Sequence, residues 1–303
     1  MNPCGFLNVN KPADCTSRDI VNRVQRILGR KIKVGHAGTL DPMATGVLVV
    51  AVGRATKLIS IAHEFSKAYT ADFRLGQTSD TDDRTGQVQQ VAVAQFPNRE
   101  QVVAALDQQV GLIQQTPPQF SAIRVQGERA YNQARAGKQV PLKPRPITVH
   151  KIDLLAFDYP TLSTFIECGS GTYIRSIARD LGQSLKTGGL MTDLRRDFVG
   201  PFHIDQALSS EQLDEYDAEQ LQRHIVPVED LFQDGCQKLT LNQEQVVKLR
   251  DGKRLSIATE HERLIAMTDQ NKFAAILERE AGDQFVAIIN WVPLWFQRDP
   301  KQP

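Results

Sequence analysis

The chain has 303 residues, of which 41% are hydrophobic and 23% charged, with 36 basic against 35 acidic side chains. This length allows one large domain or two smaller ones with a sizeable core. The four cysteines, at positions 4, 15, 168 and 236, form no Cys-x-x-Cys pair, which argues against a zinc ribbon and against a disulfide scaffold.

The formal net charge of +1 conceals an uneven distribution along the chain. Residues 1–200 hold 25 Lys and Arg against 17 Asp and Glu, whereas residues 201–303 hold 11 against 18. A local positive field attracts a phosphate backbone even when the whole chain is nearly neutral. A chance asymmetry between solvated faces is the alternative explanation.

Neither a membrane anchor nor a secretion signal is visible in the sequence. The longest apolar runs, near 47–52, are much too short to span a bilayer. The N-terminus lacks a basic region followed by a long apolar one. We therefore expect a cytoplasmic protein whose thiols are free.

The first predicted elements are a helix and a buried strand. Apolar residues at helical spacing predict a helix over 18–30, with Ser17 as a suitable N-cap. The β-branched run VLVVAVG (47–53) predicts a buried strand. The loop between them, KVGHAGTLDPMATG (33–46), combines an imidazole and a single carboxylate with several glycines.

Within this loop, Asp41 is the candidate reactive group. Gly35 and Gly38 permit turns that other residues avoid, and Pro42 favours an extended conformation for Asp41. One carboxylate would thus sit on a stiff loop at the mouth of a strand. Asp-Pro is equally an ordinary turn or helix start with Asp as N-cap. No second carboxylate lies nearby, so the paired acids of a glycosidase are not visible locally, and no P-loop motif is present.

The middle of the chain alternates between strands and helices without regular β-α repetition. We expect a strand at Tyr69–Leu75, a turn-rich acidic segment at 76–86, a helix at 99–113, strands at 147–158 and 162–168, and a helix at 173–186. A Pro-flanked stretch over 116–146 holds Lys138, Lys143 and Arg145. This pattern favours an α+β fold with a mixed or antiparallel central sheet flanked by helices.

The end of the chain changes character. The acidic segment 209–232 predicts two helices, and after Gly235 short strands follow in KLTL, RLIAMTD, KFAAILERE and QFVAIINWV. We expect a first domain over 1–235 and a small β-rich domain over 236–303.

The segment GHAGTLDPMATGVL (35–48) resembles the catalytic motif of the TruB family, bacterial synthases that make pseudouridine at position 55 of tRNA. Further blocks resemble other motifs of that family in the same order. They are the Lys-Pro motif GFLNVNKPADCTS (5–17), the tyrosine motif KAYTADFRLGQTSDTDDRTG (67–86), the RNA-gripping insertion QQTPPQFSAIRVQGERAYNQARAG (114–137), the arginine motif CGSGTYIRSIARDLG (168–182) and the leucine motif LRR (194–196).

The resemblance implies a pseudouridine synthase fold and a role for each matching residue. Asp41 is implied to be the catalytic carboxylate, with Arg175 as its ion-pair partner and Tyr69 as the active-site tyrosine. Tyr173 and Leu194 match positions that line the pocket. Without the resemblance, we would assign the residues other than Asp41 to structural positions. These four, Arg175, Tyr69, Tyr173 and Leu194, would be placed in a core or on a solvated helix face.

The remaining motif residues are implied to act on RNA or on the loop. His36 matches a histidine that fills the stack vacated by an extruded base. Lys11 and Pro12, with Gly38, match positions that support the active-site loop. The insertion, about 116–146, is implied to grip RNA, and the C-terminal domain is implied to be an RNA-contacting domain of PUA type or related. Before Lys11 the sequence has Asn10 where the family commonly has Asp.

The resemblance implies tRNA, through its T-loop, as the substrate of a stand-alone enzyme, with no metal, no cofactor, no membrane and no obligate protein partner; we expect a monomer. Two alternatives remain at this level. One is a pseudouridine synthase that acts on another RNA. The other is an RNA-binding or tRNA-folding chaperone on the same scaffold. A glycosidase is a weaker alternative because no second acid is placed.

Overall fold

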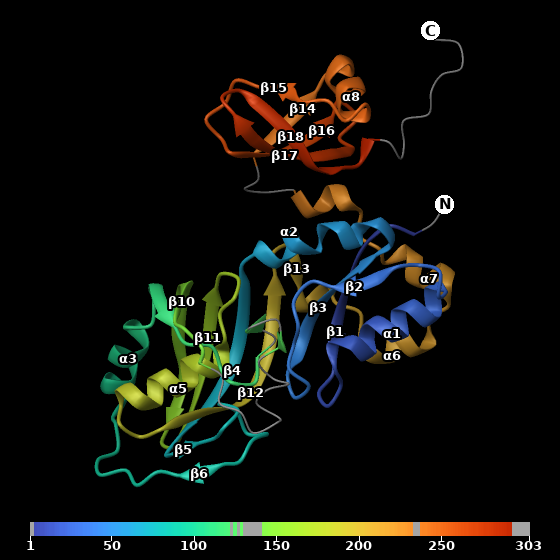
Figure 1. Ribbon diagram of the computed structural model, residues 1–303. Coiled ribbons are helices and arrows are strands. Elements are labelled where there is room, and N and C mark those ends of the chain that lie inside the picture. The colour runs from blue at the N-terminus through green and yellow to red at the C-terminus, as the bar shows by residue number, and fades with distance from the viewer. Residues whose placement is uncertain (1–2, 122–123, 126–127, 130–140, 233–236, 293–303) are drawn as a thin grey trace.

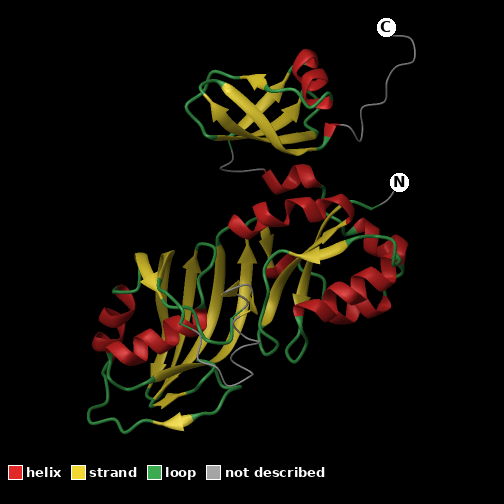
Figure 2. Cartoon of the chain, viewed as in Figure 1, coloured by secondary structure: helices red, strands yellow, loops and turns green. Residues whose placement is uncertain are grey.

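The computed structural model describes residues 3–121, 124–125, 128–129, 141–232 and 237–292 (Figure 1). A large mixed sheet with flanking helices forms most of this part, and a smaller β unit follows it in the chain (Figure 2). The α+β class with a mixed central sheet is thereby confirmed. No helix in the described ranges has the length and apolar character needed to cross a bilayer.

The large sheet has nine strands. Seven of them follow the order β1-β3-β12-β4-β11-β10-β7, while β2 pairs with β3 and β13 pairs with β12. Their bounds are β1 Gly5–Lys11, β2 Val34–His36, β3 Thr45–Val52, β4 Lys67–Leu75, β7 Gly111–Gln115, β10 Arg145–Asp158, β11 Thr161–Cys168, β12 Gly189–Val199 and β13 Phe202–His203. All neighbours are antiparallel except β3 and β12.

The parallel junction between β3 and β12 is short and very close. It pairs Arg195 with Thr45 and Arg196 with Gly46. Gly46 has a φ of +99°, and a Cβ there would lie 2.2 Å from the Arg196 carbonyl oxygen. Only glycine fits this approach. The junction brings the loop before β3, which carries Asp41, beside β12.

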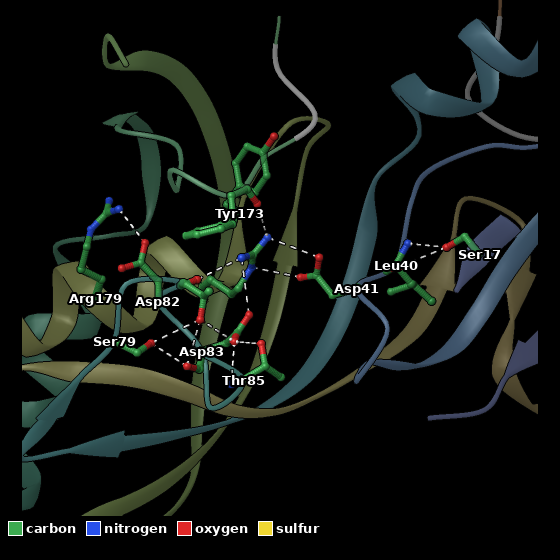
Figure 3. A network of polar contacts seen from close by, with 12 residues as sticks. Ser17, Leu40, Asp41, Ser79, Asp82, Asp83, Thr85, Tyr173 and Arg179 are labelled. Carbon is green, nitrogen blue, oxygen red and sulfur yellow. Dashed lines mark hydrogen bonds and ion pairs between the residues drawn. The ribbon is translucent and has the colours of Figure 1, made fainter. Parts of the chain in front are cut away.

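Helix α1, Ser17–Leu28, buries Ile20, Val21 and Val24 against the sheet. Its N-cap is Thr16, so the expectation for Ser17 was wrong. Thr16 and Asp19 form a reciprocal capping box, which satisfies two backbone donors. The Ser17 side chain is buried instead and exchanges hydrogen bonds with the backbone of Leu40, donating at 3.1 Å and accepting at 2.9 Å (Figure 3). The start of α1 is thus tied to the loop that holds Asp41.

The helix predicted over 99–113 is shorter in the structure. Helix α3 spans Arg99–Asp107, and the chain then turns into β7. Gly111 adopts a φ of +100°, which ends any helical continuation. Sheet pairing of β7 with β10 supplies the backbone hydrogen bonds that a longer helix would have made.

Helices cover the two halves of the sheet separately (Figure 1). Helices α3 and α5 (Ile174–Ser184) share one core with β4, β10, β11 and β12. Helices α1, α6 (Ser210–Glu215) and α7 (Ala218–Arg223) share another core with β1 and β3. Two helices therefore occupy the acidic segment, as the sequence predicts.

Several short elements complete the first part of the chain. Helix α2 spans Ile59–Glu64 after a 3-10 turn at Gly53–Leu58, and two further 3-10 turns lie at Ile204–Gln206 and Val228–Phe232. The pairs β5 (Gln77–Thr78) with β6 (Gln89–Gln90) and β8 (Arg124–Val125) with β9 (Glu128–Arg129) form two-stranded ribbons.

Residues 238–290 form the smaller unit, a five-stranded sheet in the order β14-β16-β17-β18-β15. It comprises β14 Lys238–Leu241, α8 Gln243–Arg250, β15 Leu255–Ser256, β16 Arg263–Thr268, β17 Phe273–Ala281 and β18 Gln284–Asn290. The Phe273 ring stacks on Phe232 and meets Trp291 edge-on. These rings belong to a core shared with the first part of the chain.

Candidate active site

A cavity of about 380 Å³ opens between the loop before β3, strands β4 and β12, and the start of α5. Seven residues singled out in the sequence line it together, namely Gly38, Asp41, Tyr69, Arg145, Tyr173, Arg175 and Leu194. They come from five separate segments, which are the loop before β3, strand β4, the start of β10, the start of α5 and strand β12. The resemblance motifs thus converge on one pocket.

Asp41 and Arg175 form a two-pronged ion pair in this pocket (Figure 3). Arg175 Nε lies 3.0 Å from Asp41 Oδ2, and Nη2 donates to Oδ1 at 3.3 Å. Such parallel contacts suit the planar guanidinium. The arginine side chain is 7% exposed, whereas that of Asp41 is 33% exposed. Burial raises the pKa of the Asp41 carboxyl, and the Arg175 charge opposes that rise. Asp41 therefore presents a partly open carboxylate that is held in one orientation.

The same guanidinium is anchored from behind by groups that sequence reasoning did not single out. Arg175 Nη1 donates to the Thr81 carbonyl at 2.9 Å and lies 3.4 Å from Asp83 Oδ2, and Nη2 donates to the Phe120 carbonyl at 3.1 Å. Asp83 is buried, and its Oδ1 accepts hydrogen bonds from Thr81 Oγ1 and from Thr85 N and Oγ1. Arg175 thus bridges two carboxylates (Figure 3).

Two buried cations hold the Asp41 loop. Lys11 Nζ donates to the carbonyls of Pro12, Cys15 and Pro42 at 2.6–3.1 Å. Arg196 Nη2 donates to the Gly38 carbonyl at 3.1 Å. Pro42 follows Asp41 in a turn, closed by a hydrogen bond from the amide of Ala44 to the Asp41 carbonyl at 3.0 Å, and does not begin a helix. The loop is therefore held by backbone contacts on both sides of the carboxylate.

The remaining walls are aromatic and apolar. Tyr69 and Leu194 are 7% and 5% exposed, and burial raises the pKa of the Tyr69 phenol to about 12. The phenol is therefore protonated at neutral pH. Arg145 stacks over the ring of Tyr173, with its Cζ 5.1 Å from the ring centre, and donates to the Gly171 carbonyl. A flat ring of modest size would find apolar surfaces here.

Lys67 also lines the pocket, although the sequence analysis assigned it no role. It is two residues before Tyr69 on β4, so the two side chains share one face of the strand. Its Nζ donates to the carbonyls of His63 and Phe65 at 2.9 and 2.6 Å. Burial lowers its pKa to about 8. His63 also lines the cavity.

Three predicted RNA contacts lie elsewhere or outside the described residues. His36 ends β2 and is not among the described residues that line the cavity. Its Nδ1 is buried and finds no hydrogen-bond partner in the described ranges. Lys143 is exposed just before β10. Lys138 falls outside the described residues.

No cluster of three or more metal-ligating side chains occurs in the part of the chain that the structure describes. Cys4, Cys15 and Cys168 are free thiols.

Two family models match consecutive parts of the chain. The family model of the TruB family pseudouridylate synthase N-terminal domain matches residues 25–174, and that of the tRNA pseudouridylate synthase B C-terminal domain matches residues 175–233. A tRNA pseudouridine synthase B from Arthrobacter sp. (strain FB24) is 44% identical over 246 residues, covering 78% of this chain and 80% of the relative. Another, from Nocardia farcinica (strain IFM 10152), is 48% identical over 213 residues, 69% of each chain.

Among solved structures, a chain of a Cbf5-Nop10-Gar1 complex superposes with a TM-score of 0.71 at 22% identity, covering 95% of this chain and 84% of that one. A chain of an H/ACA RNP bound to a substrate RNA gives a TM-score of 0.70 at 21% identity, with 97% and 86% covered. At this level of identity the likeness establishes the fold alone.

Proposed function

The chain belongs to the TruB family of pseudouridylate synthases, and on this premise we propose that it isomerises uridine 55 in the T-loop of tRNA to pseudouridine. The coarser activity, pseudouridine formation in tRNA, follows from the relatives that share most of its length. The choice of position 55, the catalytic role of Asp41 and the extrusion of the base are our proposals.

One observation carries the proposal most directly. A partly exposed carboxylate, Asp41, is fixed by a buried arginine at the mouth of a cavity lined with rings. Pseudouridine formation breaks the bond between C1′ and N1, turns the base and joins C1′ to C5. It needs a carboxylate at the sugar and a pocket that retains the detached uracil. Asp41 supplies the first, and the surfaces of Tyr69 and Leu194 supply the second.

The rearrangement is redox-neutral, since every atom of the substrate is kept in the product. The proton on C5 is removed and one is returned to N1. Tyr69, protonated at neutral pH, is proposed to donate a hydrogen bond to the uracil. Burial raises the pKa of Asp41, and the charge of Arg175 opposes that rise and so favours the ionised carboxylate.

We assign base extrusion to His36. A stacked base must leave the T-loop before it reaches Asp41, at a cost of roughly a few kcal/mol. Burial lowers the pKa of His36, and the nearby charges of His63, Arg196 and Arg18 lower it further. The ring is therefore neutral at pH 7 and can replace the missing base in the stack.

The grip on RNA is assigned to the insertion and to the C-terminal unit. Lys143 and Arg145 lie where the insertion returns to β10, and Arg145 also lines the pocket; Lys138 is proposed to act with them. We propose that residues 1–235 form the catalytic domain and that residues 236–303 form a PUA-like domain that contacts RNA. The enzyme is proposed to act in the cytoplasm as a monomer without an obligate protein partner.

The test is incubation of the purified chain with an unmodified tRNA transcript, followed by mapping of pseudouridine. We expect one modified position, 55, and none in a transcript that carries cytidine there. The Asp41→Ala protein is the matched control, because it keeps the RNA-binding surface. Pseudouridine at another position or only in another RNA would reassign the substrate. Bound but unmodified tRNA would favour a folding chaperone.

A further inference from the structure

Helix α5 carries a second arginine, Arg179, one turn after Arg175 and on the same side of the helix. Its Nη1 lies 2.9 Å from Asp82 Oδ2, and its Nη2 donates to the Thr116 carbonyl at 2.8 Å. Its Nε lies 2.8 Å from Asp180 Oδ1. The Arg179 and Asp82 side chains are 19% and 14% exposed. This cation is therefore largely buried outside the cavity.

The two arginines tie the same two segments to α5. In the turn 79–85, Arg175 holds Thr81 and Asp83, while Arg179 holds Asp82. In the segment 115–121, which contains the start of the insertion, Arg175 holds the Phe120 carbonyl and Arg179 holds the Thr116 carbonyl. The arrangement is a double clamp, with one arginine in the pocket and one behind it.

Other contacts strengthen the rear half of the clamp. Ser176 Oγ donates to the same Thr116 carbonyl at 3.0 Å. The Gln115 side chain donates to the Tyr173 carbonyl at 3.1 Å and accepts from the Tyr173 amide at 2.9 Å. These three hydrogen bonds join the start of α5 directly to residues 115 and 116. Among the contacts of the described residues, only Arg175 and Arg179 link the turn 79–85 to α5. On its other side the turn is joined to β12, where the Arg84 amide donates to the Met191 carbonyl at 2.9 Å and the Met191 amide donates to the Asp82 carbonyl at 3.1 Å.

We propose that Arg179 is a positioning residue for the reaction, which sets the orientation of Arg175 against Asp41 by holding the turn 79–85 against α5. This inference rests on the proposed function of the pocket. Arg179 is not among the described residues that line the cavity. It acts only through the groups that it holds.

The reason lies in the buried charge of Asp82. Asp82 has a left-handed backbone, with a φ of +60°, and burial raises its pKa while Arg179 opposes the rise. Without the guanidinium, an unpaired carboxylate would stay buried, which is strongly unfavourable. The turn would then shift towards water. Because Asp82 lies between Thr81 and Asp83, that shift would withdraw two of the partners that orient Arg175.

The experiment measures single-turnover pseudouridine formation on an unmodified tRNA transcript with enzyme in excess, from about pH 5 to 8. Arg179→Met should slow the step by roughly tenfold or more while the tRNA dissociation constant changes less than about threefold. The acid limb of the profile should also move to higher pH. The groups facing Asp41 are Arg175, Asp83, Lys11 and Tyr69. Of these, Arg175 and Lys11 lower the pKa of Asp41, and loosening Arg175 removes the larger of these two effects.

Partner variants separate this role from a general loss of stability. Arg179→Lys, which keeps the charge, should recover part of the rate. Asp82→Asn should slow the step less than Arg179→Met does, and the double variant should lose less than the product of the two single losses. Arg23→Met is the matched control, because Arg23 and Asp214 form a pair at 3.0 Å between α1 and α6, away from the pocket. It should leave the rate and the pH profile unchanged.

The inference is overturned if Arg179→Met reacts at the wild-type rate. It is also overturned if the variant only binds tRNA more weakly, while the acid limb of its pH profile stays at the wild-type pH. If Arg179→Met does not fold, the inference is tested with Arg179→Lys and Asp82→Asn instead. Wild-type rates and wild-type acid limbs for both of these variants would overturn the inference. Absence of pseudouridine with the wild-type enzyme would instead reject the proposed function, before any variant is compared.

Discussion

Charged side chains are used differently around the pocket and on the five-stranded unit. In the pocket, Arg175 is 7% exposed and Arg196 is buried, and both bind backbone carbonyls. On the smaller unit, Arg254 pairs with Glu280 at 58% and 44% exposure. Exposed pairs of this kind contribute little to stability, whereas a buried charge that loses its partner is costly. The strongest effects of substitution should therefore gather around the pocket.

The largest effect is expected at Asp41. Asp41→Asn keeps the size of the side chain but removes the charge that faces Arg175, so pseudouridine formation should fall by at least about a thousandfold. Binding of tRNA should persist, because phosphate contacts come from other residues. Rapid product mapping together with a filter-binding assay checks both. Normal turnover by Asp41→Asn would show that the Asp41 carboxylate has no role in the reaction.

A smaller loss, roughly a hundredfold, is expected for Arg175→Lys. A point charge cannot reach both Asp41 oxygens, Asp83 and two carbonyls together. The loss of the fork should also raise the pKa of Asp41, which must be ionised to act. Activity should then disappear at a higher pH than in the wild type as the solution is acidified. A superimposable pH profile would contradict this.

Replacement of His36 should show which property of the ring matters. If the ring stacks in the place of the extruded base, His36→Phe should keep more activity than His36→Ala, which we expect to lose about tenfold or more. The profile should lack a required ionisation near 6.5, the ordinary histidine pKa. A His36→Phe protein as inactive as Asp41→Asn, yet able to bind tRNA, would place His36 among the chemical groups.

Loss of charge at the insertion should weaken binding by a few-fold. Lys143→Met and Lys138→Met should each lower the slope of log affinity against log salt by about one unit. Arg145→Met should do the same and also slow the reaction, because it removes the group stacked on Tyr173. Unchanged slopes in all three would mark the stretch as an ordinary surface segment.

The smallest effect is expected for the exposed ion pair on the five-stranded unit. Arg254→Met breaks an exposed pair with Glu280, and both the melting temperature and the rate should stay at the wild-type value. Thermal unfolding measured beside the activity assay tests this. A clear loss of activity would show that the smaller unit presents Arg254 to the RNA.

The sequence predicted elements best where one periodicity dominates. The run 47–52 and the strand at Tyr69–Leu75 match β3 and β4 to within two residues. The predicted ends of elements were wrong where two neighbouring residues suit the same structural role. Thr16 and Ser17 can both cap a helix, and only the burial of Ser17 against Leu40 decides between them. Beyond Asp107, apolar spacing continued to suit a helix, but pairing with β10 overrode it.

The arrangement of the site was harder to predict from the sequence than the ends of helices and strands. Asp41 and Arg175 are 134 residues apart, and no local pattern joins them; only the resemblance to a family did. Asp80, Asp82 and Asp83 look equivalent in the acidic turn. Yet Asp80 is exposed and Asp83 is 3% exposed. That difference depends on how the turn folds against α5, which spacing along the chain does not encode.

The close junction of β3 and β12 makes Gly46 a requirement for folding. Any side chain there would strike the backbone of Arg196 on the neighbouring strand, and backbone cannot yield as a side chain can. Such a variant is lost at folding, long before catalysis is at stake. A library selected only for accumulation of intact protein should therefore be depleted of every substitution at position 46, while it tolerates change at Asp41. The contrast separates residues kept for the fold from residues kept for the reaction.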